Sequence, residues 1–239
     1  MRHIILLDTK ISDKDFSAWC KEDIAFWKEQ LGITPTYAAI RIDYSDYPTY
    51  VDSDGDIRPT NTYLKGLNAI AIKSEGGFGT DFVMMMVHSD NWRSDTETTK
   101  GIWGTNYSYV FGSQCFEYCR WDKKKVANTF GVAYHERHHS FDAIIKQELG
   151  IDILPILKVK AYDHGITHGN ETPWKYIRYK ENLDSLAIMK PYLVKAFAER
   201  KRKHEEIVKG LMETVISLAT KVLYLLRMQY NKKEGISLS

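Results

Sequence analysis

The strongest constraint on the fold is a run of residues, 82–88, that reads Phe-Val-Met-Met-Met-Val-His. Apolar residues follow one another in this run without polar residues between them. A strand with one solvent-exposed face alternates apolar and polar residues, whereas a continuous apolar run is typical of a strand that is covered on both faces. The run therefore predicts a sheet with a packed layer on each side.

Weaker patterns place further elements around this strand. Strands are predicted over 3–7, 36–43 and 107–119, and a loop over 46–60. Helices are predicted over 13–31, over 64–72 and over about 122–149, where apolar residues recur at helical spacing. Gly32 and Gly150 follow the two longer helices, as expected of residues that end a helix. Residues 155–181 read as a loop-rich region.

The C-terminal part of the chain has the pattern of one very long helix, from Pro191 to about Tyr230, with the proline in the first turn. Two neighbouring apolar stripes follow it, Val208, Leu211, Val215, Leu218, Val222 and Leu225, and Met212, Ile216, Ala219, Leu223 and Leu226. Such a broad face has to be buried against the body, a partner or another copy. The basic run 200–203 leaves a membrane-surface role as the alternative.

These patterns predict an α+β domain over residues 1–185 and a long helical extension over 186–239 that docks or self-associates. The net charge of +2 gives the chain no general attraction to nucleic acid, so no nucleic-acid partner is expected. The three cysteines are too few for a disulfide framework. We expect no transmembrane segment, and no signal peptide because the N-terminal apolar run is short. The expected location is the cytoplasm, or outside the cell after release by another route.

One motif points to chemistry. His135, Glu136 and His139 match H-E-x-x-H, the signature of zinc peptidases. Positions i and i+4 of a helix project from one face, so two imidazoles at this spacing can bind one Zn²⁺. The glutamate beside the first histidine is placed to accept a proton from a zinc-bound water and to deliver it to the leaving amine.

The helical period sorts the surrounding residues into two faces. At about 100° per residue, His135, His139 and Asp142 gather on one side of the helix. The opposite side carries the apolar residues Val126, Phe130, Tyr134, Phe141 and Ile144. Arg137 falls on that apolar side, so it has to snorkel or pair with an acid. The pattern predicts a helix that packs one face in a core and presents the motif on the other.

The segment 129–142 resembles the active-site helix of the zincin metallopeptidases, and the resemblance is confined to that helix. It implies a twisted sheet packed on the motif helix, with an edge strand that lines a cleft and binds a substrate peptide antiparallel to itself. It also implies that His135 and His139 are zinc ligands and that Glu136 is the general base and acid.

The third zinc ligand departs from the family's known patterns. The metzincin extension needs Gly at 142 and His or Asp at 145, where this chain has Asp142 and Ile145. A thermolysin-like ligand would be a glutamate on a following helix, and Glu148 is on the same helix. The polar segment 162–171 supplies the candidates, in the order His168, His164, Glu171 and Asp163.

Asp142 lies two helical turns from His135, about 10 Å along the axis, which is too far for it to share the metal with both histidines. Its expected role is to orient a ligand or to clamp the 162–171 segment.

The sequence therefore predicts a zinc-dependent metallopeptidase that hydrolyses peptide or protein substrates with Glu136 as general base. Two alternatives remain open. One is a non-catalytic interaction or assembly protein whose histidine cluster is a structural metal site or a solvated face. The other is a zinc hydrolase that acts on a non-peptide amide.

Overall fold

The computed structural model describes residues 1–51, 53, 57–74, 81–93, 101–109, 112–121, 126–157 and 180–233. At a subset of these positions it describes the backbone without the side chain, among them 101–109, 112–120, 126–132, 135, 136 and 139.

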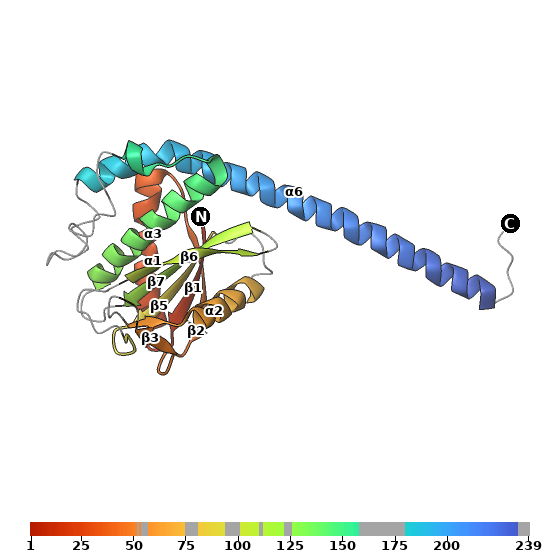
Figure 1. Ribbon diagram of the computed structural model, residues 1–239, viewed down its shortest axis with the longest axis horizontal. Coiled ribbons are helices and arrows are strands. Elements are labelled where there is room, and N and C mark those ends of the chain that lie inside the picture. The colour runs from red at the N-terminus through yellow and green to blue at the C-terminus, as the bar shows by residue number, and fades with distance from the viewer. Residues whose placement is uncertain are drawn as a thin grey trace. The chain divides into compact units, whose positions relative to one another are not determined.

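A five-stranded sheet forms the centre of the fold (Figure 1). Its strands are β1 (Arg2–Asp8), β2 (Thr36–Ile42), β5 (Phe82–His88), β6 (Gly101–Tyr109) and β7 (Gly112–Trp121). The order across the sheet is β2-β1-β5-β7-β6. The four strands β2, β1, β5 and β7 run parallel, and β6 pairs with β7 in the antiparallel direction. The antiparallel strand β6 therefore forms one edge of the sheet.

The helices lie on both faces of this sheet (Figure 1). They are α1 (Asp13–Leu31), α2 (Asn61–Ser74), α3 (Val126–Leu149) and α6 (Lys180–Lys233), with a short 3₁₀ helix at Leu154–Ile156. Alternate residues of β1 and β5 point to opposite faces of the sheet. Ile5, Leu7, Phe82, Met84 and Met86 pack against α1, α3 and the beginning of α6. Ile4, Leu6, Val83, Met85 and Val87 pack against α2 and the segment that follows β2.

The prediction from the apolar run is confirmed, because every residue of β5 is buried. The predicted helix over 13–31 is confirmed at both ends. The Oγ of Ser12 accepts a hydrogen bond from the backbone N–H of Asp15 (3.1 Å), which caps the first turn. Gly32 has φ of 71°, a left-handed conformation that glycine adopts without strain, and its N–H donates to the Lys28 carbonyl.

Three predictions about individual elements are wrong. The segment 46–60 is not a plain loop, since it contains the antiparallel pair β3 (Thr49–Val51) and β4 (Ile57–Pro59). The β structure predicted over 107–119 belongs to two antiparallel strands, β6 and β7. The long helix begins at Lys180, so Pro191 lies inside it. The residues around Pro191 explain this continuation: Leu186, Met189, Leu193 and Ala196 are all buried in the core on the α1 and α3 side, and this packing outweighs the backbone hydrogen bond that proline cannot make.

The chain is of mixed α+β type with a long C-terminal helix. It divides into two compact units, Met1–Glu199 and Arg200–Ser239, so the first unit includes the beginning of α6. Among the residues that the structure describes, no helix is long and apolar enough to cross a membrane.

Candidate metal centre

The helix α3 carries the H-E-x-x-H motif on an uninterrupted stretch of backbone. Because the helix continues through the motif, positions 135 and 139 lie one turn apart on the same face, about 6 Å along the axis. The side chains of His135, Glu136 and His139 lie outside the described part of the structure, and the backbone places each residue on the helix.

The described neighbours define the two faces of α3. From position 133 onward, the buried residues among those with described side chains are Ala133, Tyr134, Arg137, His138, Ser140, Phe141, Ile144 and Ile145. Asp142 and Ala143 are half-buried, and Lys146 is exposed. By the helical period, positions 135 and 139 fall on the side of Asp142 and Lys146, opposite the buried residues. For the residues that are described, the two-faced helix expected from the sequence is confirmed.

Aromatic contacts fix the buried face of α3 against α1 and the sheet. The ring of Tyr134 stacks on Trp27, with centroids 5.7 Å apart and planes within 6° of parallel. Phe141 meets Trp27 edge to face at 5.3 Å and Phe82 in the same way at 6.0 Å. Such pairs add specific geometry to the burial of apolar surface. The helix is therefore held in one rotation about its axis, and that rotation sets where positions 135 and 139 lie.

His138 belongs to the buried face and not to the motif face. Its side chain is fully buried, and its Nδ1–H donates to the carbonyl of Tyr134 (3.1 Å). A carbonyl only accepts, so this bond fixes the proton on Nδ1. Its ring also lies 4.2 Å from the ring of Tyr134. Of the adjacent histidines 138 and 139, the structure thus assigns His138 to packing.

Arg137 is buried on the same side, where its guanidinium carbon lies over the Phe82 ring. The sequence predicted that it snorkels or pairs with an acid; among the described residues its positive charge acts at a distance on the buried carboxyl of Asp23 on α1 and lowers the pKa of that group. Burial raises the pKa of Asp23. Arg137 and hydrogen bonds from Tyr37 and Trp27 oppose that rise, the Trp27 Nε1–H donating at 3.1 Å.

Asp142 is half-buried on the motif face, one turn beyond position 139. Its pKa is raised, first by burial and then by the negative charge of Asp152, while Lys146 acts in the opposite direction. No donor among the described residues forms a hydrogen bond with its buried Oδ1. A buried carboxylate oxygen without a donor can accept from a cation or from the N–H of a metal-bound imidazole. The residue types on this face, two histidines and Asp142, therefore fit a bound zinc ion.

The four candidates for the third ligand, Asp163, His164, His168 and Glu171, lie outside the described residues. Among the side chains that are described, no three of the types His, Cys, Asp and Glu come together closely enough to hold a metal ion. The side chains of His135 and His139 and the 162–171 segment are not among those described.

A second polar cluster, which sequence reasoning missed, lies where β1 and β5 end. The fully buried carboxylate of Asp8 accepts hydrogen bonds from the backbone N–H groups of His88 (3.0 Å) and Lys10 (2.9 Å) and from the side chain of Asn91 (2.9 Å). His88 accepts at Nδ1 from the N–H of Asp90 (3.1 Å). Both oxygens of Asp8 have partners, so this cluster ties two strand ends together. An aspartate that ends a buried strand was the signal in the sequence.

Comparison of the chain with protein-family models, with curated proteins and with solved structures finds no match.

Proposed function

We propose that this protein is a zinc-dependent metallopeptidase whose site is built on the outward face of α3. The observation that carries the proposal is the division of that helix into two faces. Its core-facing side is filled by aromatic, aliphatic and Arg137 side chains, and positions 135 and 139 fall on the other side, one turn apart. Both motif histidines are therefore at positions that the core does not use.

His135 and His139 would hold the zinc ion together with one residue of the 162–171 segment, with His168 as the first candidate. When bound, zinc supplies Lewis acidity, which lowers the pKa of a water molecule and stabilises negative charge on a carbonyl oxygen. Asp142, whose Oδ1 has no donor among the described residues, would orient one of the imidazoles.

Glu136 would move the proton. Its position lies about 100° around α3 from position 135, on the side of the half-buried Ala143 and away from the centre of the buried face. A carboxylate there can accept a proton from the attacking water and return it to the nitrogen of the leaving amine. We assign the substrate to the class of peptides and proteins.

The sheet supports a peptide substrate. β6 is an edge strand, and the Cα traces of β6 and β7 both approach α3. An extended peptide can add to such an edge through backbone hydrogen bonds, and its alternate side chains then reach the helix that carries the motif. The zincin resemblance implies an edge strand of this kind beside the motif helix.

The test is Glu136→Gln, with Glu148→Gln as the matched control on the same helix. Hydrolysis is followed by mass spectrometry on a panel of unfolded proteins, peptides and non-peptide amides, and zinc content is measured on the same samples after reloading. We expect Glu136→Gln to lose roughly 10²–10⁴-fold in rate while it retains zinc, because a general base contributes about that much. Glu148→Gln should keep both activity and zinc.

Full activity of Glu136→Gln would overturn the mechanism. Turnover of non-peptide amides alone would overturn the assignment of a peptide substrate. A wild-type protein that takes up no zinc on reloading would favour the non-catalytic assembly protein.

A further inference from the structure

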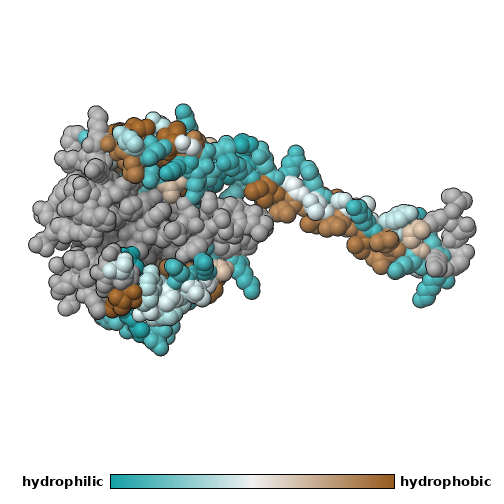
Figure 2. Space-filling model, viewed as in Figure 1, coloured by the Kyte–Doolittle hydropathy of each residue, from teal (hydrophilic) through white to brown (hydrophobic). Residues whose placement is uncertain are grey.

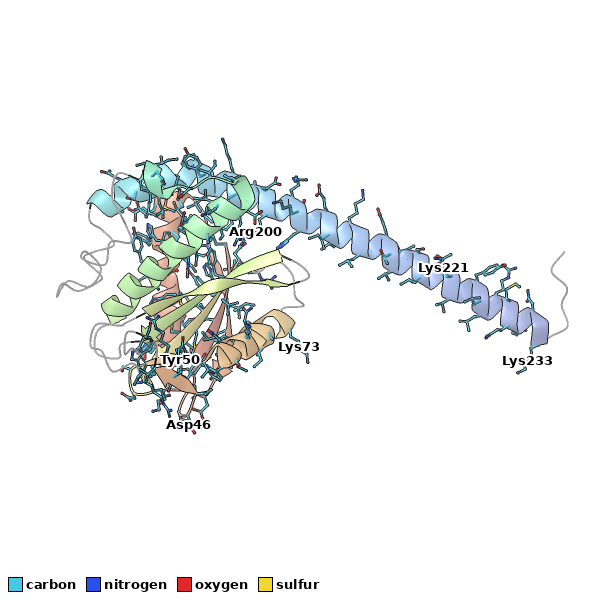
Figure 3. All side chains as sticks on the ribbon, in the orientation of Figure 1. Asp46, Tyr50, Lys73, Arg200, Lys221 and Lys233 are labelled. Atoms are coloured by element: carbon cyan, nitrogen blue, oxygen red, sulfur yellow. The ribbon has the colours of Figure 1, made fainter. Side chains whose placement is uncertain are left out.

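The C-terminal part of α6 exposes a continuous apolar face. Figure 2 shows hydrophobic side chains in a row along this helix, and Figure 3 shows the side chains of the same segment, with Lys221 and Lys233 labelled. The exposed large hydrophobic residues are Val208, Leu211, Met212, Val215, Ile216, Leu218, Val222, Leu223, Tyr224, Leu225, Leu226, Met228 and Tyr230. Apolar faces of this extent in a protein mark sites of association.

Six residues of this face follow a heptad repeat, in which positions a and d form the seam between coiled helices. Position a is valine in three successive heptads, Val208, Val215 and Val222. Position d is leucine in the same heptads, Leu211, Leu218 and Leu225. A β-branched residue at a with leucine at d favours two parallel helices, because each residue type fits the hole that the parallel pair presents at its position. We call these six residues the tail seam.

The seam has clear ends. One heptad before it, positions a and d are Lys201 and His204, and one heptad after it they are Gln229 and Lys232. Polar and charged residues at a and d are unfavourable in a coiled coil. The pairing segment is therefore confined to residues 207–228.

The charges beside the tail seam permit pairing of identical chains. Positions e and g flank the seam, and in a parallel pair each g position faces an e position of the partner. Over residues 207–228 they are Ile207, Met212, Thr214, Ala219, Lys221, Leu226 and Met228. Lys221 is the one charged residue in this set, and in a parallel pair it faces Leu226, which its aliphatic stem can cover. Two copies in register thus bring no like charges together across the interface.

We propose that residues 207–228 of two copies of this chain form a parallel, in-register coiled coil along the tail seam. The regular alternation of valine and leucine favours a second copy of the helix over a lipid surface, because a lipid surface does not discriminate between the two side chains. The residues of the segment that lie away from the seam also include Glu213, Ser217 and Thr220 beside the basic Lys209 and Arg227, which is fewer basic residues than helices that bind anionic membranes carry on their polar face. A parallel pair carries both copies of the first unit at the same end of the coil. The proposal does not depend on the zinc site.

The first test compares Leu218→Glu with Thr220→Glu in the full chain. Leu218 is a seam residue and Thr220 lies on the outer side, so the two variants carry the same added charge two residues apart. We expect sedimentation equilibrium in the micromolar range to give dimers for the wild type and for Thr220→Glu, and monomers for Leu218→Glu. A monomeric wild type would overturn the proposal, whether or not it binds vesicles of anionic lipid. Unchanged association of Leu218→Glu would overturn it too.

The second test determines the direction of the helices. A parallel pair places Val208 opposite Val208 of the other copy, whereas an antiparallel pair with the same seam places it opposite Leu225, about 26 Å along the axis. We expect Val208→Cys to form a disulfide with itself on mild oxidation, identified by mass spectrometry of the linked peptide so that native cysteines do not interfere. A crosslink that forms only when Val208→Cys is mixed with Leu225→Cys would overturn the parallel register.

Discussion

The guanidinium carbon of Arg137 lies 4.9 Å from the centroid of the Phe82 ring, and this contact joins α3 to β5 next to the H-E-x-x-H motif. Arg137 follows Glu136 in the sequence, and its charge also acts on the buried carboxylate of Asp23 on α1. One buried side chain thus connects the motif helix to the sheet. The outward position of residues 135 and 139 depends on this inward anchor.

Replacing the anchor should destabilise the fold. Arg137→Met removes the cation that lies over the Phe82 ring and one of the influences that oppose the rise in the pKa of the buried Asp23, so we expect a loss of about 2 kcal/mol. The free energy of unfolding is measured by urea titration, with the exposed Lys146→Met on the same helix as the control. The double variant Arg137→Met/Asp23→Asn should recover part of the loss, because it also removes the buried carboxyl of Asp23. Strictly additive effects of the two substitutions would contradict the coupling.

His3 should make stability depend on pH. Its ring is fully buried and stacks between the rings of Tyr37 and Phe82, with its centroid 4.8 Å from the centroid of each. Burial, followed by the positive charges of Arg137 and the N-terminus, lowers the pKa of His3 well below its usual value. The folded protein therefore keeps the imidazole neutral at a pH where the unfolded chain, with an ordinary pKa of about 6.5, binds a proton. Stability is fully present above that pH and is lost as the pH falls below it, by about 1.4 kcal/mol per pH unit for one proton.

The substitution His3→Phe isolates this contribution, since it keeps an aromatic ring in the stack and removes the proton site. Urea unfolding is measured for both proteins at a series of pH values from neutral downward. We expect the stability of His3→Phe to fall less steeply below about pH 6.5, by the equivalent of one proton. Parallel curves for the two proteins would show that His3 titrates alike in the folded and unfolded states.

Zinc binding should distinguish the adjacent histidines 138 and 139. We expect His139→Ala to lose zinc, because position 139 is on the outward face with position 135. His138→Ala should retain zinc and lose about 1–3 kcal/mol of stability, since it leaves a cavity and removes a buried hydrogen-bonding group. Zinc content after dialysis and the melting temperature with and without chelator are measured for both. Chelation should lower the melting temperature of the wild type and leave that of His139→Ala unchanged. Loss of zinc from His138→Ala and not from His139→Ala would show that His138 is the ligand.

The elements that the sequence predicted well have local signals. The apolar run of β5 and the apolar spacing of α1 and α3 each follow from a few consecutive residues, and Gly32 and Gly150 end the two helices with φ of 71° and 68°. The two faces of α3 could be predicted for the same reason, because the helical period alone sorts its residues. The three-residue strands β3 and β4 are too short to show a period, and they were not predicted.

By itself, the sequence determined the motif helix, its two faces, the buried strand behind it and the valine–leucine seam of α6. Tertiary structure alone decided that Arg137 lies over the Phe82 ring, that His138 packs inward, and that α6 continues through Pro191 to begin at Lys180. The physical reason is the range of the interactions. Helical period and capping act over one or two turns, whereas the partner of a buried charge and the packing that carries a helix past a proline come from residues distant in the chain.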